Sequence, residues 1–210
     1  MVNEWKKRWL EDRIGWHEKH GNASLKAHWA SADNKSSVLV PFCGKSKDLL
    51  WLSSHGHRVV GVEVSEIDVI AFFNENRLIF KEKFYKNIKL FEAQDIAISI
   101  YCGDYFNCNL PKADALYDRG SLVTIPPERR SNYIQHTKSL LHNDAYRFII
   151  TLEYEDGFVQ GPPYSIGTAE MLTYWSDLIQ IISYNDIDNS SPKFKKSGLN
   201  EVLETVWGSC

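Results

Sequence analysis

The chain has 210 residues, of which 43% are hydrophobic and 24% are charged, and its formal net charge is -3. This composition is ordinary for a soluble protein with one domain, and we expect a single domain over residues 1–210. A charge so close to neutrality attracts neither nucleic acid nor an anionic membrane surface. Because no apolar run approaches the roughly 20 residues that span a bilayer, we expect a cytoplasmic protein with no membrane or nucleic-acid partner.

The cysteine pattern is typical of reduced thiols. Cys43, Cys102, Cys108 and Cys210 form no CxxC pair and have no zinc-ligand spacing. The N-terminal stretch mixes charges with tryptophan, which is unlike a secretory signal peptide. We therefore expect neither a disulfide nor a bound metal.

The first half of the chain alternates between strand and helix patterns. A continuous apolar run predicts a strand that is covered on both faces, and a serine with an acid three residues later predicts the start of a helix. In chain order, the predicted elements are a strand at 37–42, a helix at 46–56 that ends at Gly56, a strand at 57–64, a helix from Ser65 that buries Ile67, Ile70 and Phe73, and two short strands within 89–104. The basic run at 81–86 is predicted to be a solvated loop.

The second half continues the alternation. Its predicted elements are a strand at 113–120, a helix at 126–141 with Pro127 near its first turn, a strand at 145–155, a helix at 168–180, and two closing strands at 181–188 and 199–207. The polar connection between the closing strands, with its basic run at 192–196, is predicted to be a loop. The whole pattern predicts an α/β, doubly wound, mostly parallel sheet with a C-terminal antiparallel hairpin.

Ligands of doubly wound sheets bind outside the carboxyl ends of the strands. The side chains that follow the predicted strands are therefore the candidate site. They lie at Phe42 to Lys45, at Glu63, at Gly103-Asp104 and at Asp118-Arg119.

The sequence Gly44-Lys45-Ser46 is similar to the end of a nucleoside-triphosphate loop. Such a loop needs another glycine five positions earlier, where this chain has Leu39, and only one of the three dinucleotide-binding glycines is present. Glu63 follows Gly44 by 63 − 44 = 19 positions, close to the roughly 20 at which a carboxylate meets a ribose. With Asp104 as an acceptor for an adenine amino group, these residues predict an adenosine-containing ligand without a pyrophosphate clamp.

Five segments resemble, in the same order, the signature blocks of the thiopurine S-methyltransferase family. They are WKKRWLEDRIGWH at 5–17, VPFCGKSKDLLWLSSHGHRVVGVEVSE at 40–66, YDRGSLVTIPPERR at 117–130, GPPYSIG at 161–167 and PKFKKSGL at 192–199. The resemblance runs from Trp5 to about Trp207. It implies a monomeric Rossmann-like class I methyltransferase. Its donor would be S-adenosylmethionine, its product S-adenosylhomocysteine, and its acceptor the thiol of an aromatic or heterocyclic small molecule such as a thiopurine.

The resemblance also implies roles for individual residues. For the cofactor, it places Trp9, Phe42, Cys43 and Gly44 around the methionine part, Glu63 on the ribose, Asp104 and Tyr105 around the adenine, and Arg119 where cofactor and acceptor meet. For the acceptor, it places Trp16, Pro162 and Pro163 as cover and Lys193 near a basic position. Residues 1–35 would form a helical lid over the cofactor. The chain departs from the family at Phe42, where leucine is usual, and at Lys193, where arginine is common.

The chemistry needs few catalytic groups, because a sulfonium methyl is already activated and a thiolate attacks it in line. Within Asp118-Arg119, the arginine would act electrostatically on an anionic acceptor. The alternative for Arg119 is an ion pair with Asp118 or another carboxylate. Cys43 is expected to be a buried thiol beside the cofactor, and His55 and His57 are expected to face solvent at a turn.

Two questions about function stay open at this point. The acceptor is a thiopurine, another thiol, or a selenium or tellurium species. The second class of function is a binding protein that keeps the cofactor site without catalysis, although Asp118-Arg119-Gly120 and Gly161-Pro162-Pro163 would then serve no purpose.

Overall fold

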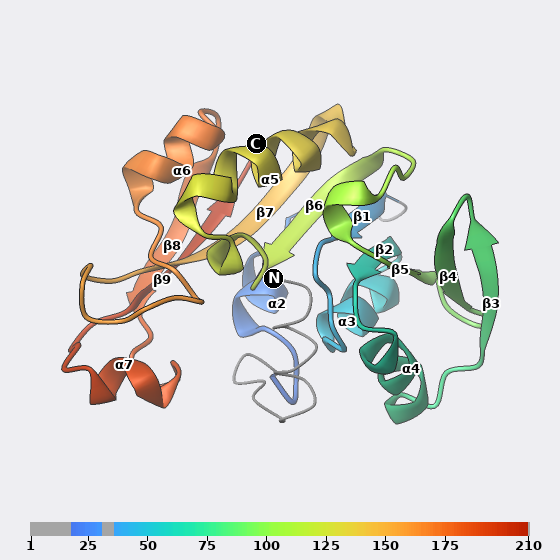
Figure 1. Ribbon diagram of the computed structural model, residues 1–210, viewed down its shortest axis with the longest axis horizontal. Coiled ribbons are helices and arrows are strands. Elements are labelled where there is room, and N and C mark those ends of the chain that lie inside the picture. The colour runs from blue at the N-terminus through green and yellow to red at the C-terminus, as the bar shows by residue number, and fades with distance from the viewer. Residues whose placement is uncertain (1–17, 31–35, 210) are drawn as a thin grey trace. The chain divides into compact units, whose positions relative to one another are not determined.

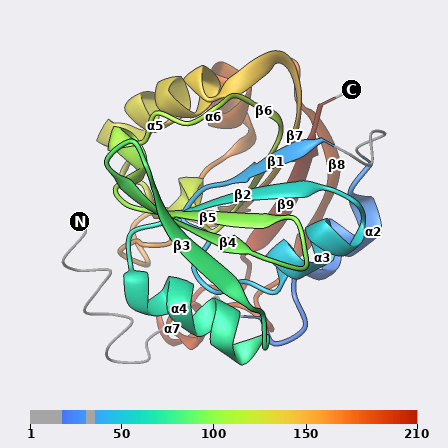
Figure 2. The ribbon, with the colours of Figure 1, turned by 90° about the vertical axis from the view of Figure 1, so that its right-hand side faces the viewer.

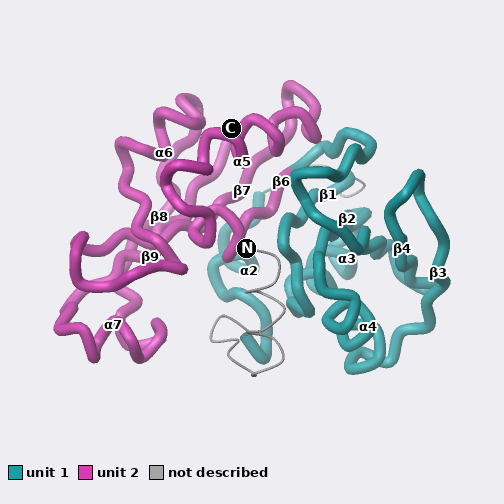
Figure 3. The backbone as a smooth tube through the Cα atoms, in the orientation of Figure 1, with its two compact units in different colours: residues 1–115 teal, residues 116–210 magenta. Residues whose placement is uncertain are grey.

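The computed structural model describes residues 18–30 and 36–209. The backbone divides into two compact units, unit 1 with residues 1–115 and unit 2 with residues 116–210 (Figure 3). Helices and strands alternate along the chain (Figure 1), so the predicted α/β class is confirmed. In the part of the chain that the structure describes, every helix is too short or too polar to cross a membrane.

Unit 1 is built on strands in the order β3-β4-β5-β2-β1 (Figure 2). The strands are β1 (Ser37–Val40), β2 (Arg58–Glu63), β3 (Phe80–Tyr85), β4 (Ile88–Ala93) and β5 (Ile98–Cys102). β2 runs parallel to β1 on one side and to β5 on the other, whereas β3 and β4 are antiparallel. The carboxyl ends of β1, β2 and β5 therefore meet at one edge of the sheet.

The parallel strands formed where the sequence predicted them. In β1, the consecutive residues Val38, Leu39 and Val40 are all buried, although neighbouring side chains of a strand point to opposite faces. A strand with this burial is covered on both sides. The uninterrupted apolar run was the signal for it.

Helices α3 (Asp48–Ser54) and α4 (Glu66–Glu75) pack against β2 and β5. The Ser65 hydroxyl accepts a hydrogen bond from the Asp68 amide at 3.4 Å, which confirms the predicted N-cap of α4. The predicted buried face of α4 was right for Phe73 and wrong for Ile67 and Ile70. Ile67 is 66% exposed and Ile70 is only partly buried, whereas Val69, Phe72 and Phe73 form the buried face at i, i+3 and i+4. The serine cap fixed where the helix begins, but contacts with the sheet decided its rotation.

The basic run at 81–86 was predicted to be a loop, and it forms most of strand β3. This strand pairs along its full length with β4, and its residues between Phe80 and Tyr85 are exposed. An ion pair between Lys83 and Glu92 at 2.7 Å crosses the two strands. Backbone hydrogen bonds and cross-strand ion pairs stabilise such an edge strand without an apolar pattern. The strand therefore leaves no hydrophobic signal in the sequence from which it could be predicted.

The predicted lid at 1–35 is only partly described. Within residues 18–30, helix α2 (Ala23–His28) is capped by the Asn22 side chain, which accepts from the Leu25 amide at 2.8 Å. The Asn22 amide donates to the buried Asp48 carboxylate at 2.6 Å. This piece of the segment is thus anchored to the start of α3.

Unit 2 carries strands in the order β6-β7-β9-β8. They are β6 (Ala113–Arg119, which starts in the last residues of unit 1), β7 (Leu141–Glu153), β8 (Ile179–Asn185) and β9 (Leu203–Gly208). Helix α5 (Pro127–Ser139) packs against β7, and α6 (Thr168–Tyr174) follows it in the chain. The predicted C-terminal antiparallel pair is confirmed, since β9 pairs antiparallel with both β7 and β8.

The connection between β8 and β9 is not the polar loop that the sequence predicted. It contains helix α7 (Pro192–Lys196). Phe194 of this helix is 1% exposed and packs in a cluster with Tyr154, Leu199 and Val202. One buried ring within a basic run was too weak a pattern to predict the helix.

Candidate active site

The turn after β1 brings the backbone to the edge of the sheet in an unusual conformation. Phe42 and Gly44 both have positive φ, at 44° and 49°. The next helix was predicted to begin at Ser46, but Ser46 still belongs to the turn, and α3 begins only at Asp48. Lys45 forms an ion pair with Glu75 at 2.7 Å. Its ammonium group is thus used to connect the turn to α4.

Glu63 is the centre of the predicted site. One carboxylate oxygen accepts from the Gly44 amide at 3.0 Å, and the other accepts from the amides of Val64 and Ser65 at 2.8 and 2.9 Å. The side chain, only 5% exposed, joins the turn after β1 to the end of β2. The 19-residue spacing therefore corresponds to a direct contact.

The environment of Glu63 changes its acidity. Burial raises the pKa of the Glu63 carboxyl to about 7, against the opposing effect of its three amide donors. Ribose hydroxyl groups that donate to this carboxylate would favour its ionised form. A carboxylate offers about four acceptor positions, and three amides occupy three of them here, so about one position is left to accept from a hydroxyl group of a nucleoside.

Asp104 and Tyr105 follow β5 at the same edge. Asp104 caps the 3-10 turn η1 (Tyr105–Asn107) and accepts from the Phe106 amide at 3.1 Å and the Asn107 side chain at 3.0 Å. Tyr105 is buried, and its ring meets the Phe42 ring edge-on at 5.4 Å. Phe42, where the family usually has leucine, is thus packed against Tyr105 within the predicted site.

Cys43 is buried, as expected. Burial first, and then the charge of Glu63, raise the pKa of the Cys43 thiol well above its usual value. A protonated thiol is a poor nucleophile, so this residue is suited to packing.

The expectation for His57 was wrong, because this side chain is 1% exposed. Its ring nitrogens contact the Trp29 indole N–H and the Ser36 hydroxyl, each at 3.0 Å. Burial lowers the pKa of His57. His55 is exposed and stacks on Trp51, in agreement with the prediction. Residues distant in sequence cover His57, and no local pattern could show this.

In unit 2, Asp118 and Arg119 close β6. The Asp118 carboxylate is 1% exposed and accepts from the Tyr133 hydroxyl at 2.7 Å and the Leu122 amide at 3.1 Å. Burial raises its pKa. Asp118 thereby holds the 3-10 turn η2 (Leu122–Thr124). Arg119 is only partly buried.

The predicted acceptor residues of unit 2 lie together. Lys193 of α7 donates to the main-chain carbonyls of Gln160 and Pro162. The Tyr154 hydroxyl donates to the carbonyl of Pro163. Trp9 and Trp16, the remaining predicted site residues, lie outside the described residues.

Arg130 is a buried residue that the sequence reading missed. Its guanidinium, 1% exposed, donates to both oxygens of Glu170 at 2.8 and 2.6 Å and to the carbonyls of Ile125 and Ser165, each at 3.1 Å. It links the segment after η2, the segment after Pro163 and helix α6. Its position one turn before the buried Tyr133 on α5 was a signal that it faces the interior.

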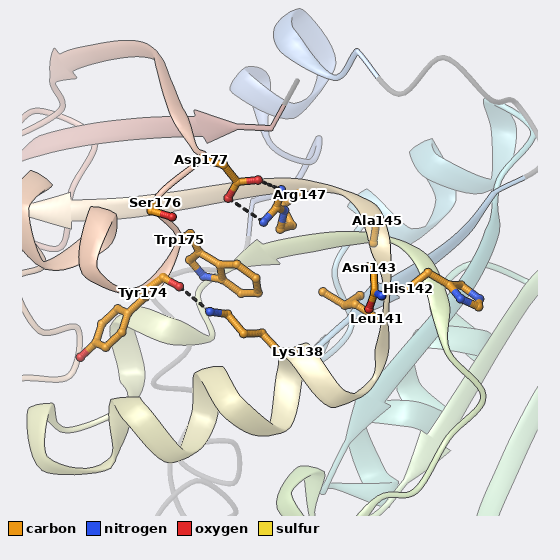
Figure 4. A pocket seen from close by; sticks show the side chains of 10 residues that line it. All are labelled: Lys138, Leu141, His142, Asn143, Ala145, Arg147, Tyr174, Trp175, Ser176 and Asp177. Atoms are coloured by element: carbon orange, nitrogen blue, oxygen red, sulfur yellow. Dashed lines mark hydrogen bonds and ion pairs between the residues drawn. The ribbon is translucent and has the colours of Figure 1, made fainter.

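A pocket of about 330 Å³ in unit 2 contains none of the predicted residues (Figure 4). Trp175 lies in it with the ammonium of Lys138 4.6 Å and the guanidinium of Arg147 5.2 Å from its ring. Asp177 pairs with Arg147. This arrangement is a cation–π cluster. Among the residues that the structure describes, His, Cys, Asp and Glu side chains form no group of three that could hold a metal.

Comparison with known sequences agrees with the resemblance. The family described as "Thiopurine S-methyltransferase (TPMT)" matches residues 1–209. A thiopurine S-methyltransferase of Pseudomonas fluorescens (strain Pf0-1) is 35% identical over 97% of this chain and 95% of its own length. One from Aliivibrio fischeri (strain MJ11) is 37% identical over 97% of this chain and 96% of its own.

Solved structures agree on the fold. A 1,6-didemethyltoxoflavin-N1-methyltransferase of Burkholderia thailandensis, with bound S-adenosylhomocysteine, has a TM-score of 0.63 at 16% identity, covering 100% of this chain and 87% of its own. A TehB-like SAM-dependent methyltransferase of Corynebacterium glutamicum has a TM-score of 0.53 at 14% identity, covering 98% and 96%. The predicted Rossmann-like class I architecture is confirmed. The chain belongs to the thiopurine S-methyltransferase family, a family of S-adenosylmethionine-dependent methyltransferases.

Proposed function

We propose that this protein transfers the methyl group of S-adenosylmethionine to the thiol or thiolate of an aromatic or heterocyclic small molecule, of which a thiopurine is the example that its relatives' names provide. Family membership supports the reaction class. The structural observation that carries the proposal is the buried Glu63 carboxylate bound to the Gly44 amide at 3.0 Å, at the adjoining ends of β1 and β2. The hydrogen bond connects Glu63, which would accept from the nucleoside part of the cofactor, to the tight turn after β1.

Unit 1 would hold the cofactor. In the proposal, Phe42, Cys43 and Gly44 line its methionine part, and Glu63 accepts from a hydroxyl group of its ribose. Asp104 and Tyr105 would frame its adenine. Trp9, outside the described residues, would complete the methionine side. The partly exposed ring of Phe42, packed against the buried ring of Tyr105, supplies an apolar surface at this edge.

When bound, S-adenosylmethionine supplies a methyl group already activated by its sulfonium sulfur. The residues of this chain align the two sulfur atoms and exclude water. The thiolate form of the acceptor, whose proton has already gone to solvent, would receive the methyl group of the bound cofactor, and S-adenosylhomocysteine would be the leaving group. Cys43 stays protonated because its pKa is raised, so its thiol does not compete for the methyl group.

Unit 2 would serve the acceptor. We assign Arg119 an electrostatic role toward an anionic thiolate, with Asp118 as the group that holds its neighbouring turn in place. Pro162 and Pro163, with Trp16 outside the described residues, would cover the ring. The proposal has the enzyme act in the cytoplasm as a monomer, and sedimentation of the purified chain tests its oligomeric state.

Incubation with methyl-labelled S-adenosylmethionine tests the function. The acceptor panel should contain thiopurines, simple aromatic thiols, selenite and tellurite, with Glu63→Ala as the matched variant. We expect label on aromatic thiols with the wild-type chain and strongly reduced label with the variant. Binding of the cofactor without label on any acceptor would contradict the enzyme proposal and favour a protein that only binds the cofactor.

A further inference from the structure

We propose that Lys193 is a positioning residue that fixes the Gly161–Pro163 segment through main-chain carbonyls and does not select acceptors by their charge. The inference rests on the proposed function, which assigns Pro162 and Pro163 to the acceptor. It gives Lys193 a different task from the basic acceptor contact that the family resemblance implied.

The Gly161–Pro163 segment has few means of being held in place. Proline has no backbone N–H, so Pro162 and Pro163 can be fixed by hydrogen bonds only through their carbonyl oxygens. Both of those oxygens accept from side chains. Lys193 donates to Pro162 at 2.7 Å, and the Tyr154 hydroxyl donates to Pro163 at 2.7 Å.

The same ammonium group also donates to the carbonyl of Gln160 at 3.2 Å. Lys193 thus forms hydrogen bonds to the backbone on both sides of Gly161. An ammonium is a compact group with three donors, which suits carbonyls in different directions, whereas the planar guanidinium of arginine matches a carboxylate. Lysine where arginine is common in the family therefore fits a main-chain contact better than recognition of an anionic acceptor.

One donor, Tyr154, belongs to a buried cluster, and the other, Lys193, is next to a member of that cluster in the chain. Phe194, next to Lys193 in α7, packs its ring against that of Tyr154 with 5.0 Å between centroids. Leu199 and Val202 complete this cluster. The backbone of Lys193 and the ring of Tyr154 are therefore placed by the same packed cluster, which favours a fixed distance between the two donors and the proline carbonyls.

The other end of the segment is also tightly placed. A Cβ at Gly161 would lie 2.2 Å from the Tyr164 ring, so only glycine permits this packing. The Tyr164 amide donates to the Val123 carbonyl at 2.6 Å. Lys193 thus adds hydrogen bonds at the carbonyls of Gln160 and Pro162, on either side of the glycine that packs against Tyr164.

Acceptors of different charge distinguish a positioning role of Lys193 from direct recognition of the acceptor's charge by Lys193. Two acceptors that differ only in a ring substituent, a carboxylate or a carboxamide, should be compared at saturating S-adenosylmethionine. For Lys193→Met we expect KM to rise about tenfold for both acceptors alike, the scale of one lost charged hydrogen bond, with cofactor affinity unchanged. Lys195→Met is the matched control, because Lys195 is on the same helix and pairs with exposed Asp188. A rise confined to the carboxylate acceptor, or no rise, would overturn the inference.

Amide hydrogen exchange at Tyr164 and Ser165 gives a readout that does not depend on activity. We expect faster exchange in Lys193→Met than in Lys195→Met, and only partial recovery in Lys193→Arg, whose donors are held in one plane. Equal exchange in the two methionine variants would contradict the positioning role. If the wild-type chain methylates no thiol, the proposed function has failed, and the exchange measurement alone still decides whether Lys193 holds the segment.

Discussion

The sulfur of Cys43 lies so close to Gly61 that a Cβ added at residue 61 would come within 2.7 Å of it. The Cys43 amide also donates to the Val62 carbonyl at 3.0 Å. The turn after β1 therefore rests directly on β2, in contact with backbone that has no side chain at this point. This close approach places the Gly44 amide within reach of Glu63.

Gly61→Ala tests this contact. We expect it to lower the free energy of unfolding by about 1 to 3 kcal/mol, the usual cost of overpacking, measured by denaturant titration. Cys43→Ala in the same chain should recover part of the loss, because it removes the clashing sulfur. Gly103→Ala is the control, since its Cβ would meet Ile88 at an ordinary 3.4 Å. Losses that simply add in the double variant would contradict the contact.

Glu63→Ala tests the ribose assignment. We expect S-adenosylmethionine binding to weaken by about 1.5 to 3 kcal/mol, the scale of hydrogen bonds to a charged group, because both the ribose acceptor and the support of the Gly44 amide are lost. Calorimetry measures this. Glu92→Ala, which removes a partly exposed partner of Lys83, should leave the affinity unchanged. Equal affinities in all three proteins would remove Glu63 from the cofactor site.

The pH dependence of cofactor binding follows from the pKa of Glu63, which burial raises to about 7. Ribose donors favour the ionised carboxylate, so binding must release a proton below that pH. We expect affinity to fall on the order of tenfold per pH unit below about 7, and to be flat over the same range in Glu63→Gln. A flat profile in the wild-type chain would contradict the assignment.

The same raised pKa has a consequence for the free protein. In the folded protein the pKa of Glu63 is higher than its unfolded value of 4.5, so the folded state binds the proton more tightly than the unfolded state does. The contribution of Glu63 to stability is therefore complete below about pH 4.5 and is lost as the pH rises through about 7.

Tyr133→Phe tests the support of Asp118. The change removes the Tyr133 hydroxyl donor from a buried carboxyl, and we expect a loss of about 1 to 3 kcal/mol in unfolding free energy. The Tyr133 hydroxyl lowers the Asp118 pKa against the larger, raising effect of burial, and so favours the ionised form. The loss should therefore be larger at high pH than at low pH. Thermal or denaturant unfolding at several pH values measures it, and a cost independent of pH would speak against the contact.

Arg119→Ala tests the electrostatic role toward the acceptor. We expect turnover of anionic thiols to fall by more than cofactor affinity does, because the proposed interaction is with the thiolate. Arg119→Lys should retain part of the activity, since it keeps the charge. Equal losses in turnover and in S-adenosylmethionine affinity would instead make Arg119 a cofactor-holding or structural residue.

Whether an element of the fold could be predicted depends on whether the contacts that stabilise it are local in the sequence. Strands β1 and β2 and the N-cap of α4 were predictable, because apolar runs and a capping serine are local signals. Strand β3 and helix α7 were not, since one depends on hydrogen bonds and ion pairs with β4 and the other on burying Phe194. These stabilising partners lie elsewhere in the chain.

By itself, the sequence determined the reaction family through its signature segments. It also placed Gly44 and Glu63 at one edge of the sheet, because ligand-binding residues of such sheets follow the carboxyl ends of the strands. Only the tertiary structure decided which partners the remaining polar groups take. It buried His57 against Trp29 and Ser36 and turned Lys193 toward main-chain carbonyls. A polar side chain bonds to whatever donor or acceptor folding brings within about 3 Å of it, and that neighbour is set by the packing of distant segments.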